Sequence, residues 1–433
     1  MTAPAAPARE FIAEPTTVAE LGLDRGMLMD LTLKAMFYRG RMTRSELSDS
    51  LKISGSAMQE VMQDLTQDGL VSVLGAEGNS ASGYVYALTQ KGRDRADAAF
   101  NRTGYVGPAP VPLVEYIAQI RAQTIGEVTV TREQVLEALR GLVLSDETVG
   151  RIGRAAASRK STLIYGPSGN GKTTAVHAIG AAIGGTIQIP YAIEMVGQLV
   201  HLFDMSKHEP VDDPDRAGGL IKARADRRWV RIKRPTIWAG GELTRHSLEL
   251  MYDDNTRVYE APLQLKANGG TLVIDDFGRQ QIPAVQLLNR WIVALEGGVD
   301  HLTLHTGQTI EVPFDVLVLF STNLPPERLA DEAFLRRIRY KVELPNPTRD
   351  EFRAIFRGEC AVRSLPYNDG AVDHLLANWY DDHQRELRGC HPRDLVEAVV
   401  DAAQYDNRAP SITAATLDEA CTTYFLRPLS TPA

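Results

Sequence analysis

The chain has 433 residues, with 44% hydrophobic and 24% charged content, which is ordinary for a globular protein of roughly two to three domains. No run approaches the ~18 uninterrupted apolar residues that a membrane span needs, so no span is expected. The net charge of −8 argues against a protein that binds nucleic acid over its whole surface. The three cysteines, Cys360, Cys390 and Cys421, lack metal-site spacing and favour a reducing, cytoplasmic environment.

The first segment, residues 1–20, is rich in alanine and proline and lacks the apolar core of a secretion signal, which predicts a disordered tail. Apolar residues at helical spacing then cover residues 27–38. Thr43 and Glu46 form a capping-box pattern that begins a second helix, and a third helix is expected over residues 55–68.

A hairpin and a fourth helix follow. Residues 70–74 and 84–88 have the composition of strands, and the loop between them is rich in glycine, serine and asparagine. The fourth helix is expected from Gln90. Three helices with such a hairpin resemble a winged helix-turn-helix domain, which we assign to residues 21–105. Prolines in the next stretch predict a semi-rigid, extended linker, placed at residues 106–129.

The resemblance to winged helices implies DNA binding, but the helix at residues 55–68 lacks the charge for it. This helix carries Glu60, Asp64 and Asp68 and contains neither lysine nor arginine. A helix that reads the major groove needs cations for the phosphates and donors for the base edges. We therefore expect the domain to recruit a protein partner, and we keep nucleic-acid binding as the alternative.

The most informative stretch is residues 166–173, which fit the phosphate-loop pattern G-x-x-x-x-G-K-[ST]. Apolar residues 161–165 predict a buried strand before it, and alanine-rich residues 174–183 predict a helix after it. In such a loop the backbone N–H groups and the lysine bind phosphates, while the threonine hydroxyl binds Mg²⁺. We therefore expect ATP and Mg²⁺ as cofactors. The residues expected to bind ATP here are Gly166, Pro167, Ser168, Gly169, Asn170, Gly171, Lys172, Thr173 and Thr174, with Thr173 also a metal ligand.

After the next core strand, expected at residues 185–190, a long span must contain structure of its own. Residues 191–203 alternate as a hairpin, and residues 229–233 and 236–239 are expected to be further strands. Seven basic residues lie between Lys222 and Arg234. We expect them to form a solvated face, with an acidic partner or a nucleic-acid backbone as the alternative.

Polar residues follow two later apolar strands. The strand at residues 271–276 ends in Asp275, expected to organise Mg²⁺, and Asp276, expected to orient the attacking water. The strand at residues 316–320 leads to Asn323, which can hold the same water near the γ-phosphate. Further on, the adjacent arginines Arg336 and Arg337 follow a short helix. One of them is expected to reach into a neighbouring subunit and stabilise the transferring phosphoryl group, and an intramolecular salt bridge is the alternative.

The order of these motifs resembles that of the AAA+ ATPases over about residues 130–426. The resemblance implies an α/β fold, with a parallel sheet flanked by helices and an α-helical lid. It places the ATPase core at residues 130–345, with an insertion around residues 191–262, and the lid at residues 346–433. In the lid, residues 389–395 resemble the second sensor of that family, so Arg393 would contact the nucleotide.

Two details narrow the likeness. Residues 263–276 are similar to the same region of MoxR-type ATPases and enhancer-binding activators, and a hairpin expected over residues 302–312 resembles one that lines the ring's pore there. The departure is Asp276, because the family usually has glutamate at this position. Aspartate is one methylene shorter, which implies slow hydrolysis or help from another acid such as Glu242.

The favoured hypothesis is a cytoplasmic, homo-oligomeric ATPase, a hexameric ring that remodels or loads an unknown protein client with ATP between its subunits. The alternative is a winged-helix DNA-binding regulator or a DNA-processing ATPase. A third hypothesis is an assembly scaffold that is gated by nucleotide and turns over negligibly.

Overall fold

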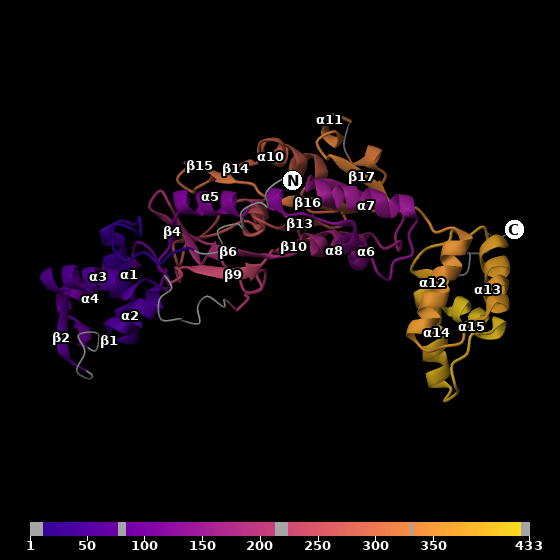
Figure 1. Ribbon diagram of the computed structural model, residues 1–433, viewed down its shortest axis with the longest axis horizontal. Coiled ribbons are helices and arrows are strands. Elements are labelled where there is room, and N and C mark those ends of the chain that lie inside the picture. The colour runs from indigo at the N-terminus through magenta and orange to yellow at the C-terminus, as the bar shows by residue number, and fades with distance from the viewer. Residues whose placement is uncertain (1–11, 77–83, 213–223, 330–331, 426–433) are drawn as a thin grey trace, which may run out of the picture.

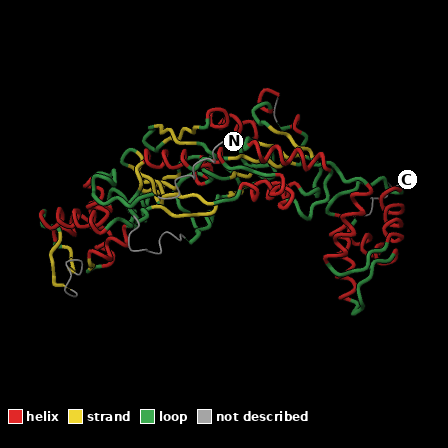
Figure 2. Tube along the Cα trace, in the orientation of Figure 1, coloured by secondary structure: helices red, strands yellow, loops and turns green. Residues whose placement is uncertain are grey.

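The structure, a computed structural model, describes residues 12–76, 84–212, 224–329 and 332–425. The molecule is elongated, with helices α1–α4 at one end, helices α12–α15 at the other and a sheet-containing core between them (Figure 1). Strands are concentrated in the core and in a small sheet of the N-terminal end, whereas the C-terminal end is helical (Figure 2). Within the described ranges, no helix is long and apolar enough to cross a membrane.

The N-terminal unit, residues 21–105, has the helices and strands that its sequence predicts. The helices are α1 (Arg25–Arg39), α2 (Arg44–Leu51), α3 (Gly55–Gln67) and α4 (Gln90–Phe100). The antiparallel sheet has the order β1 (Met42–Thr43), β3 (Tyr84–Leu88) and β2 (Val71–Ala76). The predicted loop falls largely on residues 77–83, which lie outside the described residues. Thr43 and Glu46 cap α2 reciprocally, as the sequence predicts.

Part of the expected disordered tail is packed, which corrects the prediction for residues 1–20. Residues 1–11 lie outside the described residues, but Ala13 forms an antiparallel bridge with Ala225. The Glu14 N–H donates to the carbonyl of Arg224 at 2.7 Å, and Val18 is buried in the core of the N-terminal unit. The composition of the tail could not reveal this, because the hydrogen-bond partners come from a segment far along the chain.

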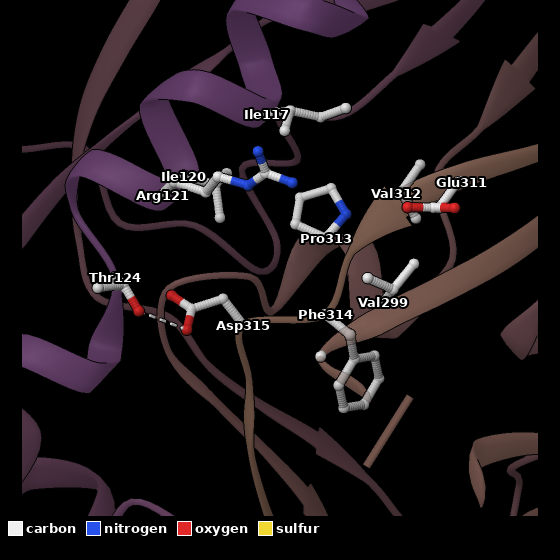
Figure 3. Close-up of a pocket in the computed structure, with 11 residues that line it drawn as sticks. Ile117, Ile120, Arg121, Thr124, Val299, Glu311, Val312, Pro313, Phe314 and Asp315 are labelled. Atoms are coloured by element: carbon white, nitrogen blue, oxygen red, sulfur yellow. Dashed lines mark hydrogen bonds between the residues drawn. The ribbon is translucent and has the colours of Figure 1, made fainter. Parts of the chain in front are cut away.

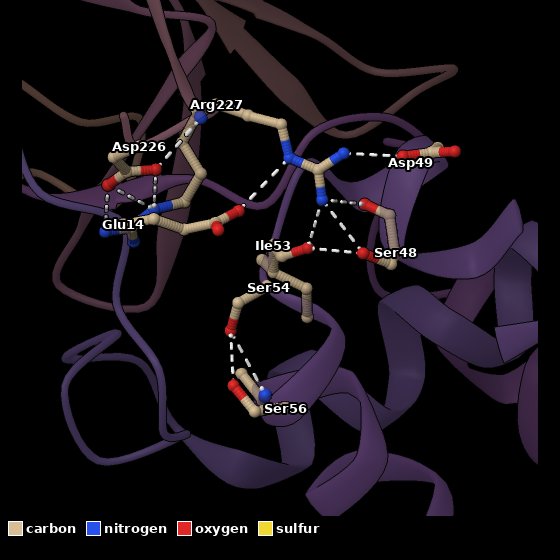
Figure 4. A network of polar contacts seen from close by, with 10 residues as sticks. Glu14, Ser48, Asp49, Ile53, Ser54, Ser56, Asp226 and Arg227 are labelled. Carbon is tan, nitrogen blue, oxygen red and sulfur yellow. Dashed lines mark hydrogen bonds and ion pairs between the residues drawn. The ribbon is translucent and has the colours of Figure 1, made fainter. Parts of the chain in front are cut away.

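Two residues of the basic run that was expected to be a solvated face, Arg227 and Arg228, instead join the N-terminal unit to the core, which corrects that prediction for them. Lys222 lies outside the described residues, and Arg224 and Lys233 are exposed. Arg227 forms ion pairs with Glu14 at 3.1 Å and Asp49 at 2.5 Å. Its guanidinium also donates to the Ser48 hydroxyl at 2.9 Å and the Ile53 carbonyl at 2.5 Å (Figure 4). These contacts fix the end of α2 and the turn before α3 to the segment that precedes β9 (Trp229–Lys233).

Arg228 is buried more deeply than Arg227, with 0% exposure. Its Nη2 atom lies 2.8 Å from Asp226 and 3.4 Å from Glu115. Its Nη1 atom donates to the carbonyls of Leu21 at 3.2 Å and Pro110 at 3.3 Å. Burial raises the pKa of the Glu115 carboxyl, and the positive charge of Arg228 opposes this shift. Buried charges persist in proteins when they are paired and hydrogen-bonded, so this arginine is a structural element of the joint.

A second, mixed sheet lies beside the joint and contains the predicted hairpin. Its strand order is β11 (Met251–Asp253), β12 (Val258–Glu260), β8 (Gln198–His201), β7 (Ala192–Met195) and β4 (Val111–Pro112). Strand β4 and the helix α5 (Leu113–Ala122) lie in the range predicted to be an extended linker, and Val111, Tyr116 and Ile120 are buried in this region's core. The segment at residues 106–129 is therefore folded onto the core, because its apolar side chains complete the second sheet.

The central sheet is entirely parallel. Its order is β10 (Thr236–Ala239), β13 (Thr271–Ile274), β16 (Leu317–Thr322), β5 (Thr162–Tyr165) and β17 (Tyr340–Glu343). Strand β10 lies inside the range that the sequence assigned to an insertion. The predicted core strand, β6 (Thr186–Pro190), instead pairs antiparallel with β9 and stays outside this sheet. The strand beside β13, which precedes Asp275 and Asp276, is thus β10, and it comes from later in the chain than the predicted core strand β6.

Helices cover both faces of the parallel sheet, because successive strand residues point to opposite sides. On one face, Val273, Leu317 and Leu319 pack with α6 (Arg132–Ala138), α7 (Asp146–Ser158) and α8 (Lys172–Ile183). On the other face, Leu272, Ile274, Val318 and Phe320 pack with α10 (Ala284–Gly297) and the short α9 (Leu263–Lys266). The expected α/β class with a helix-flanked parallel sheet is confirmed.

The hairpin of β14 (Val299–Thr303) and β15 (Thr309–Pro313) lies where the sequence predicts it. Its apolar side chains, Leu302, Leu304, Ile310 and Val312, are buried in the core of the second sheet. Just after it, Asp315 accepts hydrogen bonds from the Thr124 hydroxyl and the Ile125 N–H, both at 2.8 Å, beside a cleft of ≈ 290 Å³ (Figure 3). The hairpin is therefore anchored to α5 and the second sheet, and its place in a pore stays a prediction.

The C-terminal unit, residues 348–425, is a helical bundle with its own apolar core. Its helices are α12 (Arg349–Val362), α13 (Asp369–Leu375), α14 (His391–Tyr405) and α15 (Ala414–Tyr424), with a π-helical segment at Leu376–Asp381. Phe352, Phe356 and Leu395 are fully buried within it. Residues 345–347 lead into this unit directly from β17, so its start lies at the same edge of the parallel sheet as the phosphate loop.

Candidate nucleotide site

The glycine loop connects β5 to α8 through backbone conformations that favour glycine. Gly166, Gly169 and Gly171 have φ angles of 139°, 84° and 80°. A Cβ at Gly166 would lie 2.2 Å from the carbonyl oxygen of Leu344, so no larger residue fits there. The loop can therefore turn tightly, and α8 begins at Lys172, within the motif of residues 166–173.

The side chain of Lys172 is folded back over the loop. Its Nζ atom donates to the carbonyl of Gly166 at 3.0 Å and to that of Pro167 at 2.8 Å, and the residue is 7% exposed. Burial lowers the pKa of this ammonium group, and the nearby Asp275 and Asp276 oppose the shift. Lys172 is thus a cation held close to two carboxylates, at the start of a helix whose dipole also favours anions.

Two carboxylates follow strand β13 at the same edge of the sheet. The Asp276 N–H donates to Asp275 Oδ1 at 3.0 Å, and Asp276 has a left-handed backbone with a φ of 50°. Gln280 Nε2 donates to the Asp275 carbonyl at 2.6 Å and holds the turn. Directly after the neighbouring strand β16, Asn323 Nδ2 donates to Asp276 Oδ1 at 3.3 Å. The parallel strands therefore bring the predicted carboxylates and the predicted asparagine together.

These residues line a cleft of ≈ 770 Å³ between the core and the C-terminal unit. Most of the residues predicted from the sequence lie in its wall. They are Ser168, Gly169, Asn170, Gly171, Lys172, Thr173, Thr174, Asp275, Asp276, Asn323 and Arg393. The other two predicted loop residues, Gly166 and Pro167, are not in this wall, and their carbonyls accept the hydrogen bonds from Lys172. Strand order reverses beside β5, and ligands of open α/β sheets bind at the carboxyl ends of strands at such a point.

Sequence reasoning missed several other residues of this wall. The loop before α7 contributes residues 140–145, and Arg279 comes from the turn after the acid pair. From the C-terminal unit, Glu351 and Glu359 of α12 line the cleft. Arg279 could have been suspected from the sequence, because it is only four residues after Asp275 and must lie near the end of the same strand. The residues of α12 could not, because only the placement of the C-terminal unit brings them here.

Oxygen ligands suited to Mg²⁺ are present in the cleft. The Thr173 hydroxyl and the Asp275 carboxylate both line it, and Mg²⁺ in phosphate sites is held by one or two carboxylates together with phosphate oxygens and waters. Among the residues that the structure describes, no three His, Cys, Asp or Glu side chains gather into a metal-binding group. The donor set therefore fits a cation shared with a phosphate.

Arg393 lies in the cleft wall, but its guanidinium is engaged within the C-terminal unit. Its Nη2 and Nε atoms donate to Asp394 Oδ1 at 2.8 and 3.0 Å, and this ion pair raises the pKa of the arginine further. Tyr424 donates to the other oxygen of the same carboxylate at 2.7 Å. Arg393 is therefore oriented by α14 and α15 rather than by a contact with the phosphate loop.

The adjacent arginines after α11 (Glu332–Leu335) are not part of the wall of this cleft. Arg336 is exposed, and its backbone N–H donates to the Glu332 carbonyl at 3.0 Å. Arg337 is half-buried and forms an ion pair with Glu296 at 3.1 Å. The two predicted candidates thus differ: Arg336 is presented on the surface, whereas Arg337 matches the intramolecular salt bridge that the sequence left open.

Glu242, the other acid that the sequence suggested, has a local role. Its Oε1 atom accepts a hydrogen bond from the Gly240 N–H at 2.9 Å, just after β10. It is absent from the wall of the cleft formed by the described residues. Asp276 is therefore the better placed of the two acids.

Comparisons with known proteins give few matches in sequence. The model of a family described as "Domain of unknown function (DUF8689)" matches residues 348–423, the C-terminal unit. No curated protein matches the chain.

Several solved structures are similar at low identity. NtrX from Brucella abortus in complex with ATP is 17% identical, with a TM-score of 0.40, over 65% of this chain and 56% of that one. NtrX in complex with ADP is also 17% identical, with a TM-score of 0.41, over 79% and 68%. The RuvB Holliday junction branch migration motor of Thermotoga maritima is 12% identical, with a TM-score of 0.36, over 69% and 72%. The chain thus spans little more than half of the first of these proteins, and its architecture is established by its own strand order.

Proposed function

We propose that the chain is an ATP-hydrolysing enzyme of the AAA+ type, with ATP and Mg²⁺ bound in the cleft at the carboxyl ends of β5, β13 and β16. The observation that carries this proposal is the convergence of the glycine loop, Lys172, Asp275 and Asn323 at one edge of a parallel sheet. Each part was expected from the sequence for a chemical reason, and a chance glycine turn would not be accompanied by the other three.

In this proposal each side chain has a defined task. The loop N–H groups and Lys172 hold the phosphates, and Lys172 exchanges its bonds to two loop carbonyls for bonds to phosphate oxygens. Thr173 and Asp275 hold Mg²⁺, which would neutralise the charge that develops between the β- and γ-phosphates. Asp276 and Asn323, already in contact, would orient a water molecule for attack on the γ-phosphorus, and the Asp276 carboxylate would accept its proton.

The reaction needs a further positive charge at the transferring phosphoryl group. Arg336 suits this role in a neighbouring subunit, because it is exposed and lies away from the cleft of its own chain. Arg337 would then act through its ion pair with Glu296 and hold the end of α11 in place. The proposal therefore includes a homo-oligomeric ring with ATP between subunits.

The N-terminal unit is proposed to be a winged-helix domain that recruits a protein client for remodelling or loading. Helix α3 presents Asp64 and Glu60 to Arg25 of α1, at 2.8 and 3.6 Å. The helix that would enter a DNA groove thus carries carboxylates whose charge is partly balanced within the unit, and a duplex would be repelled. A protein partner agrees better with this surface than DNA does.

The variant Lys172→Ala tests the proposed site most simply. It removes the cation of the phosphate loop, so binding of ATP should fall at least 100-fold and hydrolysis should be lost. Binding is measured by titration with a fluorescent ATP analogue, and hydrolysis by phosphate release. Lys160→Ala, on the exposed turn before β5, is the matched control and should leave both unchanged. Unchanged ATP binding by the Lys172 variant would contradict the assignment of this site.

A further inference from the structure

Asn170, within the glycine loop, uses its whole side-chain amide in contacts with segments outside the loop. Its Nδ2 atom donates to the Pro345 carbonyl at 3.1 Å and to Asn346 Oδ1 at 2.8 Å. Its Oδ1 atom accepts from the Gly389 N–H at 2.9 Å. The residue is 8% exposed, so each of these bonds satisfies a polar group that water barely reaches. Phosphate binding by backbone N–H groups and a lysine requires none of the three.

The backbones of the loop and the C-terminal unit touch at the same place. A Cβ at Gly389 would lie 3.2 Å from the carbonyl oxygen of Gly169 and 3.5 Å from Asn170 Cα. A Cβ at Gly169 would lie 2.4 Å from the Cys390 sulfur. Glycine on both sides is what allows this close approach. The segment before α14 therefore sits directly on the loop that is proposed to hold the phosphates.

Asn170 is also the point where three segments of the chain meet. Asn346 lies in the connection between β17 and α12, and it also donates to Glu386 of the C-terminal unit at 3.2 Å. Among the residues that the structure describes, no other hydrogen bond or ion pair joins residues 348–425 to residues before Pro345. Apart from the connecting segment with Asn346, the C-terminal unit is thus hydrogen-bonded to the core through the side chain of Asn170.

We propose that Asn170 is a positioning residue that seats the C-terminal unit on the phosphate loop and makes this seating depend on bound nucleotide. This inference rests on the function proposed above. The loop cannot bind phosphates without rearranging around Lys172, whose Nζ atom is bonded to two of the loop's carbonyls. A change in the loop is passed to Gly389 and Asn346 because the amide of Asn170 is bonded to both.

The charges near the contact between Asn170 and Gly389 indicate whether ATP strengthens or weakens it. Arg388 precedes Gly389 and lies beside the phosphate loop, since a Cβ at Gly169 would lie 4.0 Å from Arg388 Cβ, and Arg393 lines the same cleft as Lys172. The negative charge of phosphates placed near Lys172 would attract both arginines. Bound ATP should therefore stabilise the contact between the segment at Gly389 and Asn170.

The Gly389 N–H is a direct reporter, because its hydrogen-bond acceptor is Asn170 Oδ1. The test is hydrogen exchange of this amide, resolved by mass spectrometry, in the full-length protein with and without ATP and Mg²⁺. In the natural protein, ATP should slow the exchange. In Asn170→Leu, which keeps the side-chain volume and removes all three bonds, exchange without nucleotide should be at least roughly 5-fold faster, the factor that corresponds to one lost hydrogen bond. ATP should no longer slow the exchange in this variant. Because coupling is reciprocal, the affinity for ATP should fall by the same factor by which ATP slows the exchange in the natural protein.

Asn368→Ala is the matched control for a general loosening of the C-terminal unit. Asn368 caps α13 by accepting from the Ala371 N–H at 3.2 Å, and it donates to the Ile412 carbonyl at 3.2 Å, wholly within that unit. This variant should destabilise the bundle and keep the ATP-dependent slowing at Gly389. A second variant, Asn346→Ala, removes one of the three hydrogen bonds of the Asn170 amide. Exchange at Gly389 should then be faster than in the natural protein and slower than in Asn170→Leu.

Three results would overturn the inference: unchanged exchange in Asn170→Leu, ATP-dependent slowing that survives in it, or the same loss of slowing in Asn368→Ala. Failure of the proposed function would look different. If the natural protein binds no ATP, the comparison of Asn170→Leu with the natural protein in the absence of nucleotide still decides whether Asn170 seats the C-terminal unit.

Discussion

The two ends of the molecule are attached to the core in different ways. The N-terminal unit is held by an ionic joint in which Arg228 is fully buried and Arg227 bonds to α2 and to the segment before α3. The C-terminal unit is joined by its connecting segment and by the amide of Asn170. Breaking the first joint leaves a buried charge uncompensated, whereas breaking the second costs a few neutral hydrogen bonds.

This difference indicates which end can move during a cycle of hydrolysis. A unit fastened by buried charges moves with the core as one body, and the N-terminal unit would carry its client along with the second sheet. A unit seated on the phosphate loop by one amide can tilt about residues 345–347 at low cost. Movement that follows nucleotide is therefore expected at the C-terminal end, where the cleft wall is shared by both bodies.

The largest expected effect concerns the N-terminal joint. Arg228→Met keeps most of the side-chain volume and removes the charge, leaving Asp226, 3% exposed, without its partner. Breaking a buried ion pair in this way costs about 3–5 kcal/mol of unfolding free energy. The measurement is denaturant unfolding of the variant beside Arg224→Ala, which changes an exposed arginine nearby. The double variant Arg228→Met, Asp226→Asn should recover part of the loss.

A loss below about 1 kcal/mol in Arg228→Met would contradict the view of a rigid N-terminal joint. The contrast between the two ends would then have to be abandoned, because the N-terminal unit would be as loosely attached as the C-terminal one.

A smaller effect is expected at the C-terminal end as the pH falls. Burial lowers the pKa of His391 to about 4 from its ordinary 6.5, and its Nδ1 lies 2.9 Å from the Tyr380 hydroxyl. Arg388 and Arg385 also lower this pKa, and Asp394 opposes them. The unfolded state therefore takes up a proton first, so stability is complete above pH 6.5 and is lost as the pH falls toward 4. The loss amounts to roughly 3 kcal/mol at most.

Acidification should thus unfold the C-terminal unit before the N-terminal unit, as followed by hydrogen exchange of α14 and α1 between pH 7 and pH 4. His391→Gln should flatten this pH dependence, and His383→Gln, which changes an exposed histidine of the same unit, should not. Equal pH dependence in both histidine variants would show that another group is responsible.

The sequence was most informative where the chemistry is local. Thr43, the glycine loop and the hairpins at residues 191–203 and 302–312 lie where they were predicted, because caps, tight turns and alternation depend on nearby residues. The convergence of Asp275, Asp276 and Asn323 was also predictable, since parallel strands end at one edge.

The failures share a physical cause, which is pairing between segments far apart in the chain. Strand β6 had the pattern of a core strand, but it pairs with β9 outside the parallel sheet. Strand β10 pairs with β13 instead. The basic run looked solvated because Glu14, Asp49 and Asp226, which neutralise Arg227 and Arg228, come partly from the other end of the sequence. The role of Asn170 was hidden for the same reason, because Gly389 lies in another unit.

The measurement that tests the account most directly is ATP hydrolysis by mixed variants. Arg336→Ala should bind ATP normally and lose at least 1,000-fold in turnover, since an arginine in this role contributes roughly 10³–10⁵. Lys172→Ala chains hydrolyse nothing themselves but still present Arg336. When the two inactive variants are mixed, phosphate release should rise well above the sum of the separate rates, because each Lys172→Ala chain completes the site of an Arg336→Ala neighbour. A mixture that releases no more phosphate than that sum would contradict a site shared between subunits.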